Sequence, residues 1–274
     1  MRLRGASILA TLAGVPIGIE ALEDWICART PPPRHSEGLD DPLSIAALFH
    51  FALSAEESGA DPIARATLNM VRTLLDDRAE AALWAPDDLV RFGPVWREAE
   101  TLLRAPYPSV GLAPLADRVL AVRAALPAML TARDQLVTTI DGRQLRFEGR
   151  SFDLNWIIAC HFPAALEANG LALRRLPLMV ALPRLLPDNR EALEEQLQVM
   201  IVDQARSGLS ELDRLERLLR ALPEDAGLTR RSHVPLFRRL NLVYPGLSRV
   251  AVARLLGISH QGATKLMERA ASGC

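Results

Sequence analysis

Lysine is almost missing from this chain of 274 residues: Lys265 is the only one among 32 basic side chains. The abundance of arginine extends over the whole chain, so it does not by itself indicate chemistry that requires a guanidinium. Aromatic residues make up only 5% of the sequence, so the core must be built from Leu, Ala and Val. That mixture, with few β-branched runs, favours helices.

Cysteine and long hydrophobic runs are scarce as well. Cys27, Cys160 and Cys274 are far apart and lack CxxC spacing, which suits a reducing cytoplasm. The N-terminal stretch 1–22 is weakly apolar, but it has no clear cleavage site, and acidic residues follow at once. We interpret it as a buried helix broken near residues 14–16 and resumed at 17–28, in a cytoplasmic protein without a membrane segment.

Motifs of catalysis and metal binding are absent. The histidines show neither HExxH nor His-x-His spacing, and the stretch 14–18 (GVPIG) is no phosphate-binding loop. Cys160 and His161 are adjacent, so on a helix they diverge by about 100° and do not form a dyad. His50 lies in an apolar stretch and is expected to be a hydrogen-bonded core histidine. We therefore predict that the protein is not an enzyme and needs no metal or cofactor.

The most informative stretch is 248–269, SRVAVARLLGISHQGATKLMER. Gly257 can end a first helix in the left-handed conformation, and Ser259 is a good N-cap for a second helix. Ala263 and Leu266 would form the inward face of that second helix, above Ile258. The pattern is typical of a helix-turn-helix, whose second helix enters the DNA major groove.

Charge is distributed unevenly along the chain. From residue 229 onward, eight basic residues stand against Glu268 alone, a net charge of +7; because the whole chain carries −1, residues 1–228 carry −8. A basic segment on an acidic body is typical of phosphate contact. We expect phosphate contacts from Arg230, Arg231, Arg238, Arg239, Arg249, Arg254 and Arg269. The expected base contacts come from the outward face of the second helix: His260, Gln261, Thr264 and Lys265.

The run from Ser210 to Ala271 resembles the C-terminal region of an uncharacterised bacterial helix-turn-helix family whose members often occur on plasmids and mobile elements. The matching positions are Gly208-Leu209, Arg231-Ser232 and Leu255 with Gly257-Ile258-Ser259. Members of that family continue into a short basic strand pair, whereas this chain stops at Cys274. The resemblance therefore implies DNA binding by the helices, without a wing contact.

The body shows repeated helix starts. An Asp or Ala precedes Pro at 41–42, 61–62 and 85–86, which predicts helices from 42 to 58, from 61 to 77 and from 85 until Gly93-Pro94 interrupts it. Further helices are expected at 114–126, 128–137 and 154–168. Asp141-Gly142 between 137–140 and 143–147 predicts a β-hairpin, interpreted as structural, with a contact point for a partner as the alternative.

Before the basic segment we expect two helices, one from 188 to 206 and another from 209 to 222, separated at Gly208. The second carries a leucine stripe: Leu212, Leu215, Leu219 and Leu222. Such a stripe most often packs into the core of its own chain. The alternative is a dimer seam, in which it packs against a second copy.

The sequence thus predicts a mostly α-helical protein with a helical body (1–225), one small β-hairpin and a C-terminal three-helix module (226–274), with helices at 232–243, 248–256 and 259–271. The expected function is sequence-specific binding of double-stranded DNA by a homodimer, in transcription regulation or mobile-element control. The alternative is a protein-interaction module, an antitoxin or adaptor, whose basic end docks on an acidic partner. The sequence does not identify a small-molecule effector.

Overall fold

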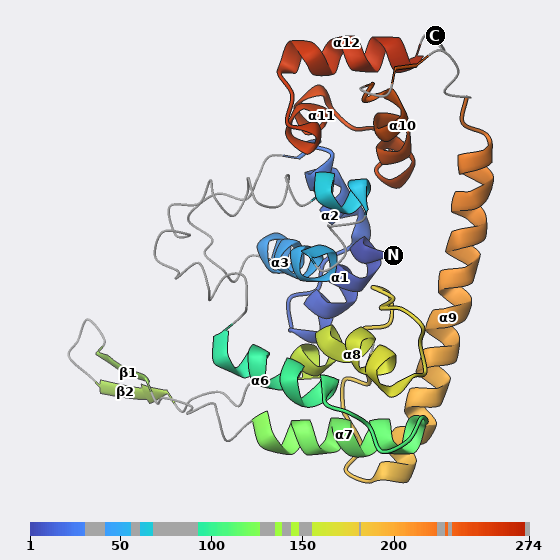
Figure 1. Ribbon diagram of the computed structural model, residues 1–274. Helices are drawn as coiled ribbons and strands as arrows, with labels where there is room; N and C mark the ends of the chain where they lie inside the picture. The colour runs from blue at the N-terminus through green and yellow to red at the C-terminus, as the bar shows by residue number, and fades with distance from the viewer. Residues whose placement is uncertain are drawn as a thin grey trace.

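The computed structural model describes residues 1–30, 42–55, 61–67, 93–126, 135–138, 144–147, 155–180, 182–223, 228–229 and 232–271. Helices dominate these ranges, so the prediction of a mostly α-helical protein is confirmed (Figure 1). The helices are α1 (Arg2–Leu12), α2 (Ile19–Ile26), α3 (Pro42–Ala55), α6 (Gly93–Arg104), α7 (Leu112–Ala125), α8 (Asn155–Asn169), α9 (Arg190–Arg220), α10 (Val234–Val243), α11 (Arg249–Leu256) and α12 (His260–Ala271).

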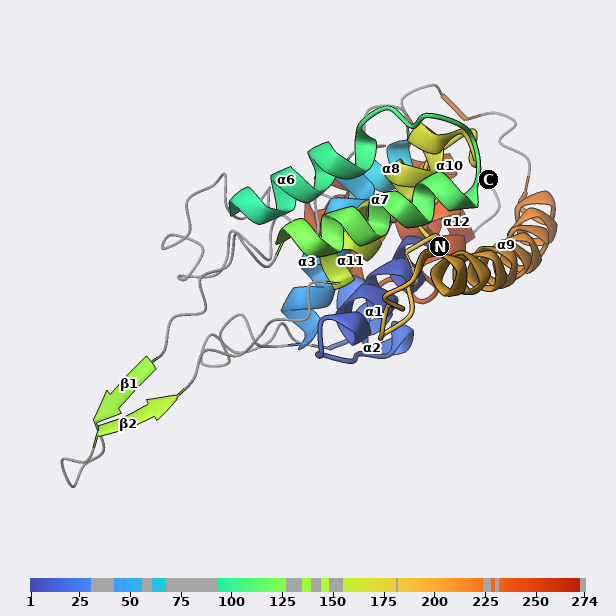
Figure 2. The ribbon, with the colours of Figure 1, turned by 90° about the horizontal axis from the view of Figure 1, so that it is seen from below.

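The helices share one hydrophobic core. In the body, α1 packs against α3, α6 against α8, and α7 against α9. Buried Leu, Ala, Val and Ile side chains supply most of this core, which continues into α10–α12. Figure 1 shows α9 running along one side of the body, from the level of α7 towards the level of α10. Figure 2 gives the same arrangement from below, with α6 and α7 in front.

Gly14 and Asp61 explain where one helix ends and another begins in the N-terminal half. The predicted break in the N-terminal stretch is confirmed: α1 ends at Leu12, Gly14 has φ +82°, and α2 begins at Ile19. Asp61 Oδ1 accepts a hydrogen bond from Ile63 N at 2.9 Å and so starts the helix of residues 62–67. The rest of that helix and the one expected from residue 85 lie outside the described residues, and α6 begins at Gly93.

The break expected at Gly208 is wrong, because α9 is a single helix of 31 residues. At 1.5 Å per residue it is about 46 Å long. Gly208 is buried, and a Cβ added there would lie 3.2 Å from Leu178 Cδ2. A helix tolerates one glycine at a cost of about 1 kcal/mol relative to alanine. Here the missing side chain lets the 177–178 segment approach α9 closely.

Two strands stand apart from the helices in both views (Figures 1 and 2). β1 (Gln135–Thr138) and β2 (Gln144–Phe147) form an antiparallel pair in which Thr138 faces Gln144. The strands predicted from the sequence were 137–140 and 143–147. Residues 139–143, where the Asp-Gly turn was expected, lie outside the described residues. The helix expected at 128–137 is wrong at its end, because residues 135–137 belong to β1, and its earlier residues also lie outside the described ones.

Within the described ranges, no helix combines the length and the apolar character that crossing a bilayer requires.

Candidate nucleic-acid interface

The C-terminal helical unit, defined here as α10–α12, has α12 packed across both α10 and α11. Its helices begin and end within two residues of the bounds predicted from the sequence. Apolar residues on the inner faces of all three helices form the core of the unit. They are Val234, Phe237, Leu240, Ala251, Val252, Leu255, Ala263 and Leu266. The predicted inward role of Ala263 and Leu266 is thus confirmed.

The turn between α11 and α12 has the geometry expected of its residues. Gly257 lies in the left-handed region, with φ 64° and ψ 35°, and ends α11. Ile258 N donates to Ala253 O at 3.0 Å, which satisfies a carbonyl of the last turn. Ser259 Oγ accepts from Gly262 N at 3.1 Å and so caps α12. Ser248 starts α11 in the same way, accepting from Ala251 N at 3.1 Å.

This capping also accounts for Gly262. A Cβ added at Gly262 would lie 3.2 Å from Ser259 Oγ and 3.8 Å from Ile258 Cβ. A side chain at this position would crowd the capping hydroxyl. The geometry of the turn therefore explains why residue 262 is glycine, without invoking contact with a ligand.

The residues expected to contact bases lie on the outer side of α12. His260, Gln261 and Lys265 are exposed, while Thr264 is half-buried and its hydroxyl donates to His260 O at 3.1 Å. In Figure 1, α12 is at the end of the molecule opposite α7, with α10 and α11 between it and the body. The predicted base-contact side chains are therefore brought together on one accessible helix face.

The residues expected to contact phosphates have mixed environments. Arg239, Arg249 and Arg269 are exposed, and Arg254 is half-buried. These arginines come from all three helices of the unit. Arg230 and Arg231 lie outside the described residues.

Arg238 is the exception, and its predicted phosphate contact is contradicted by its burial. Its side chain is only 8% exposed, and Nη1 donates to Pro223 O at 3.4 Å. Arg238 is one helical turn beyond Val234, which places it on the buried side of α10. The i,i+4 spacing from Val234 could have indicated in the sequence that Arg238 is buried. A count of charges ignores this spacing.

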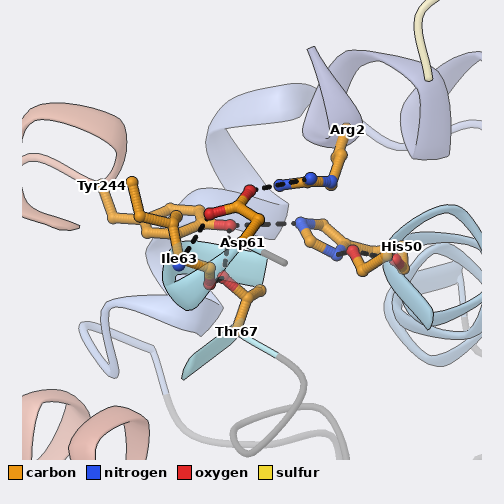
Figure 3. Close-up of polar contacts among 7 residues, drawn as sticks. Arg2, His50, Asp61, Ile63, Thr67 and Tyr244 are labelled. Atoms are coloured by element: carbon orange, nitrogen blue, oxygen red, sulfur yellow. Dashed lines mark hydrogen bonds and ion pairs between the residues drawn. The ribbon is translucent and has the colours of Figure 1, made fainter. Parts of the chain in front are cut away.

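Tyr244, the residue that ends α10, anchors the unit to the body (Figure 3). Its hydroxyl lies 3.3 Å from His50 Nε2 and 3.1 Å from Thr67 Oγ1, and all three side chains are buried. Burial also raises the pKa of Tyr244 to about 12, so the phenol stays protonated. Nothing in the local sequence pairs Tyr244 with His50, because 194 residues separate them.

The protonation of His50 follows from its neighbours. Burial lowers the pKa of His50 to about 3, so the ring is neutral near pH 7. Ser54 donates to His50 O at 2.6 Å, and its Oγ lies 3.1 Å from His50 Nδ1. Nδ1 thus faces the Ser54 hydroxyl and Nε2 faces the Tyr244 hydroxyl, so both ring nitrogens have a polar partner. The expectation of a hydrogen-bonded core histidine is confirmed.

A second set of contacts joins α2 to the segment between α10 and α11. Ser248 N donates to Cys27 O at 3.1 Å, and the thiol of Cys27 donates to Pro245 O at 3.6 Å. Arg29 Nη1 also donates to Pro245 O, and Arg29 pairs with Asp24 at 2.7 Å. The boundary predicted between residues 225 and 226 lies outside the described residues. The contacts on either side of it join the body and the unit into one packed structure.

Cys160 and His161, adjacent in α8, do not form a catalytic pair. Burial raises the pKa of the Cys160 thiol, the reverse of what an activated nucleophile needs. The ring of His161 packs 4.2 Å from that of Trp96, and burial lowers its pKa to about 4. In the described ranges, no three His, Cys, Asp or Glu side chains gather in a way that could hold a metal ion.

The chain was compared with models of known protein families, with curated proteins and with solved structures, and no match was found in any of the three. Its function has therefore to be inferred from the side chains of α10–α12 and from what they can bind.

Proposed function

We propose that this protein binds double-stranded DNA in a sequence-specific manner, with α12 as the recognition helix of a helix-turn-helix, and acts in transcription regulation or mobile-element control. The observation that carries the proposal is the two-sided character of α12. Ala263 and Leu266 are buried against the unit, while His260, Gln261 and Lys265 are exposed on the opposite side. A recognition helix needs one face fixed by packing and another free to read base edges.

The chemistry of the exposed face fits base recognition. The amide of Gln261 can pair with adenine N6 and N7, and the ammonium of Lys265 can reach the guanine acceptors O6 and N7. His260 and Gln261 lie in the first turn of α12, the part of a recognition helix that contacts bases. The half-buried Thr264 adds a hydroxyl and a methyl group on the same side.

Phosphate contact is assigned to Arg239, Arg249 and Arg269, with Arg254 in support. Their exposure leaves the guanidinium groups free to replace the counterions of DNA. Arg230 and Arg231 remain in the proposal from their place in the basic segment alone. The resemblance of residues 208–271 to a bacterial helix-turn-helix family supports the same function.

A homodimer is part of this proposal, because one small unit contacts little DNA and two-fold sites are the usual solution. The leucine stripe of α9 supports it. Leu212 and Leu219 are each 49% exposed, and Leu215 is half-buried. Leucines that pack in the core of a single chain are covered by that chain, whereas these remain partly exposed and can be covered by a second copy.

Selection of binding sites from random duplex DNA with the full chain tests the proposal. The wild-type protein is expected to enrich one motif, and Gln261→Ala to lose preference at one or two positions of it, each worth about 1–3 kcal/mol. Arg184→Ala is the control, since Arg184 is exposed and lies in the body. If the selected pool stays random, or if Gln261→Ala selects the unchanged motif, α12 is not a recognition helix.

A further inference from the structure

An apolar groove lies outside the C-terminal helical unit, between α9 and the segment 171–179. Its volume is about 590 Å³, within the range of about 300–1,000 Å³ that small-molecule sites occupy. Residues from α7, α8, α9 and the 171–179 segment line it, and they are almost all apolar. They include Leu112, Leu166, Leu171, Met179, Ile201 and Val202.

The groove is held open by contacts at both ends of its outer wall. At one end Ala172 N donates to Leu166 O at 3.1 Å, and Arg175 pairs with Glu167 at 2.7 Å. At the other end the buried Leu178 side chain packs over Gly208 of α9. The wall is therefore pre-formed, as ligand sites usually are.

One cation lies at the groove. Arg174 is exposed and, among the described residues, it has no ion pair or hydrogen bond. It also lines a neighbouring cavity of about 540 Å³, where further arginines lie together with the carboxylates of Glu23, Asp61 and Glu211. The other polar residue of the apolar groove is Gln198. The lining of the apolar groove thus contains one positive group and no carboxylate, and the carboxylates of the adjoining cavity lie outside it.

From this combination we infer that the groove binds an amphipathic anion, a medium-chain carboxylate whose alkyl tail lies between Leu166 and Val202 and whose carboxylate pairs with Arg174. Burial of the tail supplies the affinity, because the lining now exposes apolar surface to water: Leu171 is 40% and Leu176 41% exposed. Arg174 makes the site selective for an anion over a neutral alcohol. The site stands apart from α12, so it does not depend on the proposed DNA binding.

The test is calorimetric titration of the full chain with decanoate, 1-decanol and butyrate. Decanoate is expected to bind, 1-decanol more weakly, and butyrate not measurably. Arg174→Gln should lower decanoate affinity about fivefold, to the level of the alcohol, as loss of one exposed ion pair implies. Arg184→Gln, a matched exposed arginine outside the groove, should leave the affinity unchanged.

A second pair of variants tests the tail. Val202→Glu places a carboxylate in the groove wall and should lower decanoate affinity by at least about tenfold. Val199→Glu introduces the same charge on α9 at a residue that is 57% exposed and does not line the groove, so it should have no effect. Circular dichroism checks that both variants fold.

Three results would overturn the inference. The first is that decanoate does not bind the wild-type chain. The Val199 and Val202 variants could bind it equally. Light scattering could show a dimer that Val202→Glu alone dissociates, in which case a second copy covers the groove.

Discussion

Arg238 and Arg239 are neighbours on α10, but they lie in opposite environments. Arg238 is buried and bonded to Pro223 O, whereas Arg239 is exposed. Arg238→Ala should therefore lower the free energy of unfolding by about 1–3 kcal/mol, because it removes a buried side chain and its hydrogen bond to Pro223 O and leaves a cavity on the inner side of α10. Arg239→Ala should change stability by less than about 0.5 kcal/mol. Urea denaturation of both variants measures the two effects.

The same pair separates folding from DNA contact. Arg239→Ala should weaken binding to every duplex alike and reduce the slope of log affinity against log salt by about 0.9, the value of one phosphate contact. Arg238→Ala, once folded, should keep the wild-type slope. The assignment of the two arginines would be wrong if their slopes changed in the reverse order.

His50 gives the protein a pH dependence below neutrality. The pKa of its ring is about 3 in the folded chain against an ordinary value of 6.5, so the unfolded chain binds more protons between these values. The contribution of the neutral ring to the free energy of unfolding is complete above pH 6.5 and is lost as the pH falls towards 3. His161, whose pKa burial lowers to about 4, adds a loss in the same direction.

His50→Gln isolates this contribution. The variant should be less stable than wild type at pH 7, and the difference should shrink as the pH falls from 6.5 to 4.5, because only the wild type loses the His50 contribution. Denaturant titrations at a series of pH values measure it. Parallel stability profiles for the two proteins would contradict the assignment.

Much of the residue-level detail is readable in the sequence, since it is local. The cap by Ser259, the left-handed Gly257 and the inward Ala263 all follow from spacing within one turn of helix. The burial of Arg238 and the pairing of Tyr244 with His50 depend on which faces meet after folding. Net charge and local pattern carry no such information.

At the scale of elements, α9 departs furthest from the sequence-based expectation. Gly208 was expected to end a helix, because glycine weakens helices wherever it occurs. Its actual role is to let Leu178 pack closely, a tertiary contact across 30 residues. The consequence is an unbroken helix that carries the groove at residues 198–205 and the leucine stripe from 212 onward.

The leucine stripe yields a prediction about assembly. Because Leu212 and Leu219 are each about half exposed in the single chain, replacing both by Asp should leave the fold intact. If the stripe is the dimer seam, the double variant should be a monomer, because the new charges would have to be buried at the interface. Leu185→Asp is the control, since Leu185 is 85% exposed and lies outside α9.

Light scattering and far-UV circular dichroism decide the outcome. A folded monomer with lowered DNA affinity supports the seam, since two linked half-sites bind far better than one. A folded dimer of unchanged size would place the dimer contact elsewhere, and loss of helical signal would show that the stripe is needed by the single chain.

At the scale of the whole molecule, the C-terminal helical unit is tied to the body through α2 and through the buried His50–Tyr244–Thr67 contacts. The boundary expected near residue 225 from the change in charge lies outside the described residues, and buried side chains on both sides of it belong to one hydrophobic core. A change in charge indicates a difference in surface chemistry. It does not indicate a separate domain, because a domain that folds independently needs a hydrophobic core of its own.

Tyr244→Phe tests this connection. The change removes the buried hydroxyl that contacts both His50 Nε2 and Thr67 Oγ1, so it should lower the free energy of unfolding by about 1–3 kcal/mol. Tryptophan fluorescence and far-UV circular dichroism should report one coincident unfolding transition in the wild type and in the variant. Tyr107→Phe is the control, because the Tyr107 hydroxyl donates only to Leu103 O within its own region. Two separate transitions in the wild type would mean that the unit folds on its own.

Salt-dependent DNA binding by the full chain tests the central claim most directly. Fluorescence anisotropy of a labelled duplex should show affinity that falls steeply between about 50 and 200 mM salt, as counterion release requires. The triple variant Arg239→Glu, Arg249→Glu, Lys265→Glu should lose that binding, while Arg184→Glu should keep it. A wild-type chain without DNA affinity at low salt, or a triple variant that binds as well as wild type, would contradict the assignment of α10–α12 to DNA.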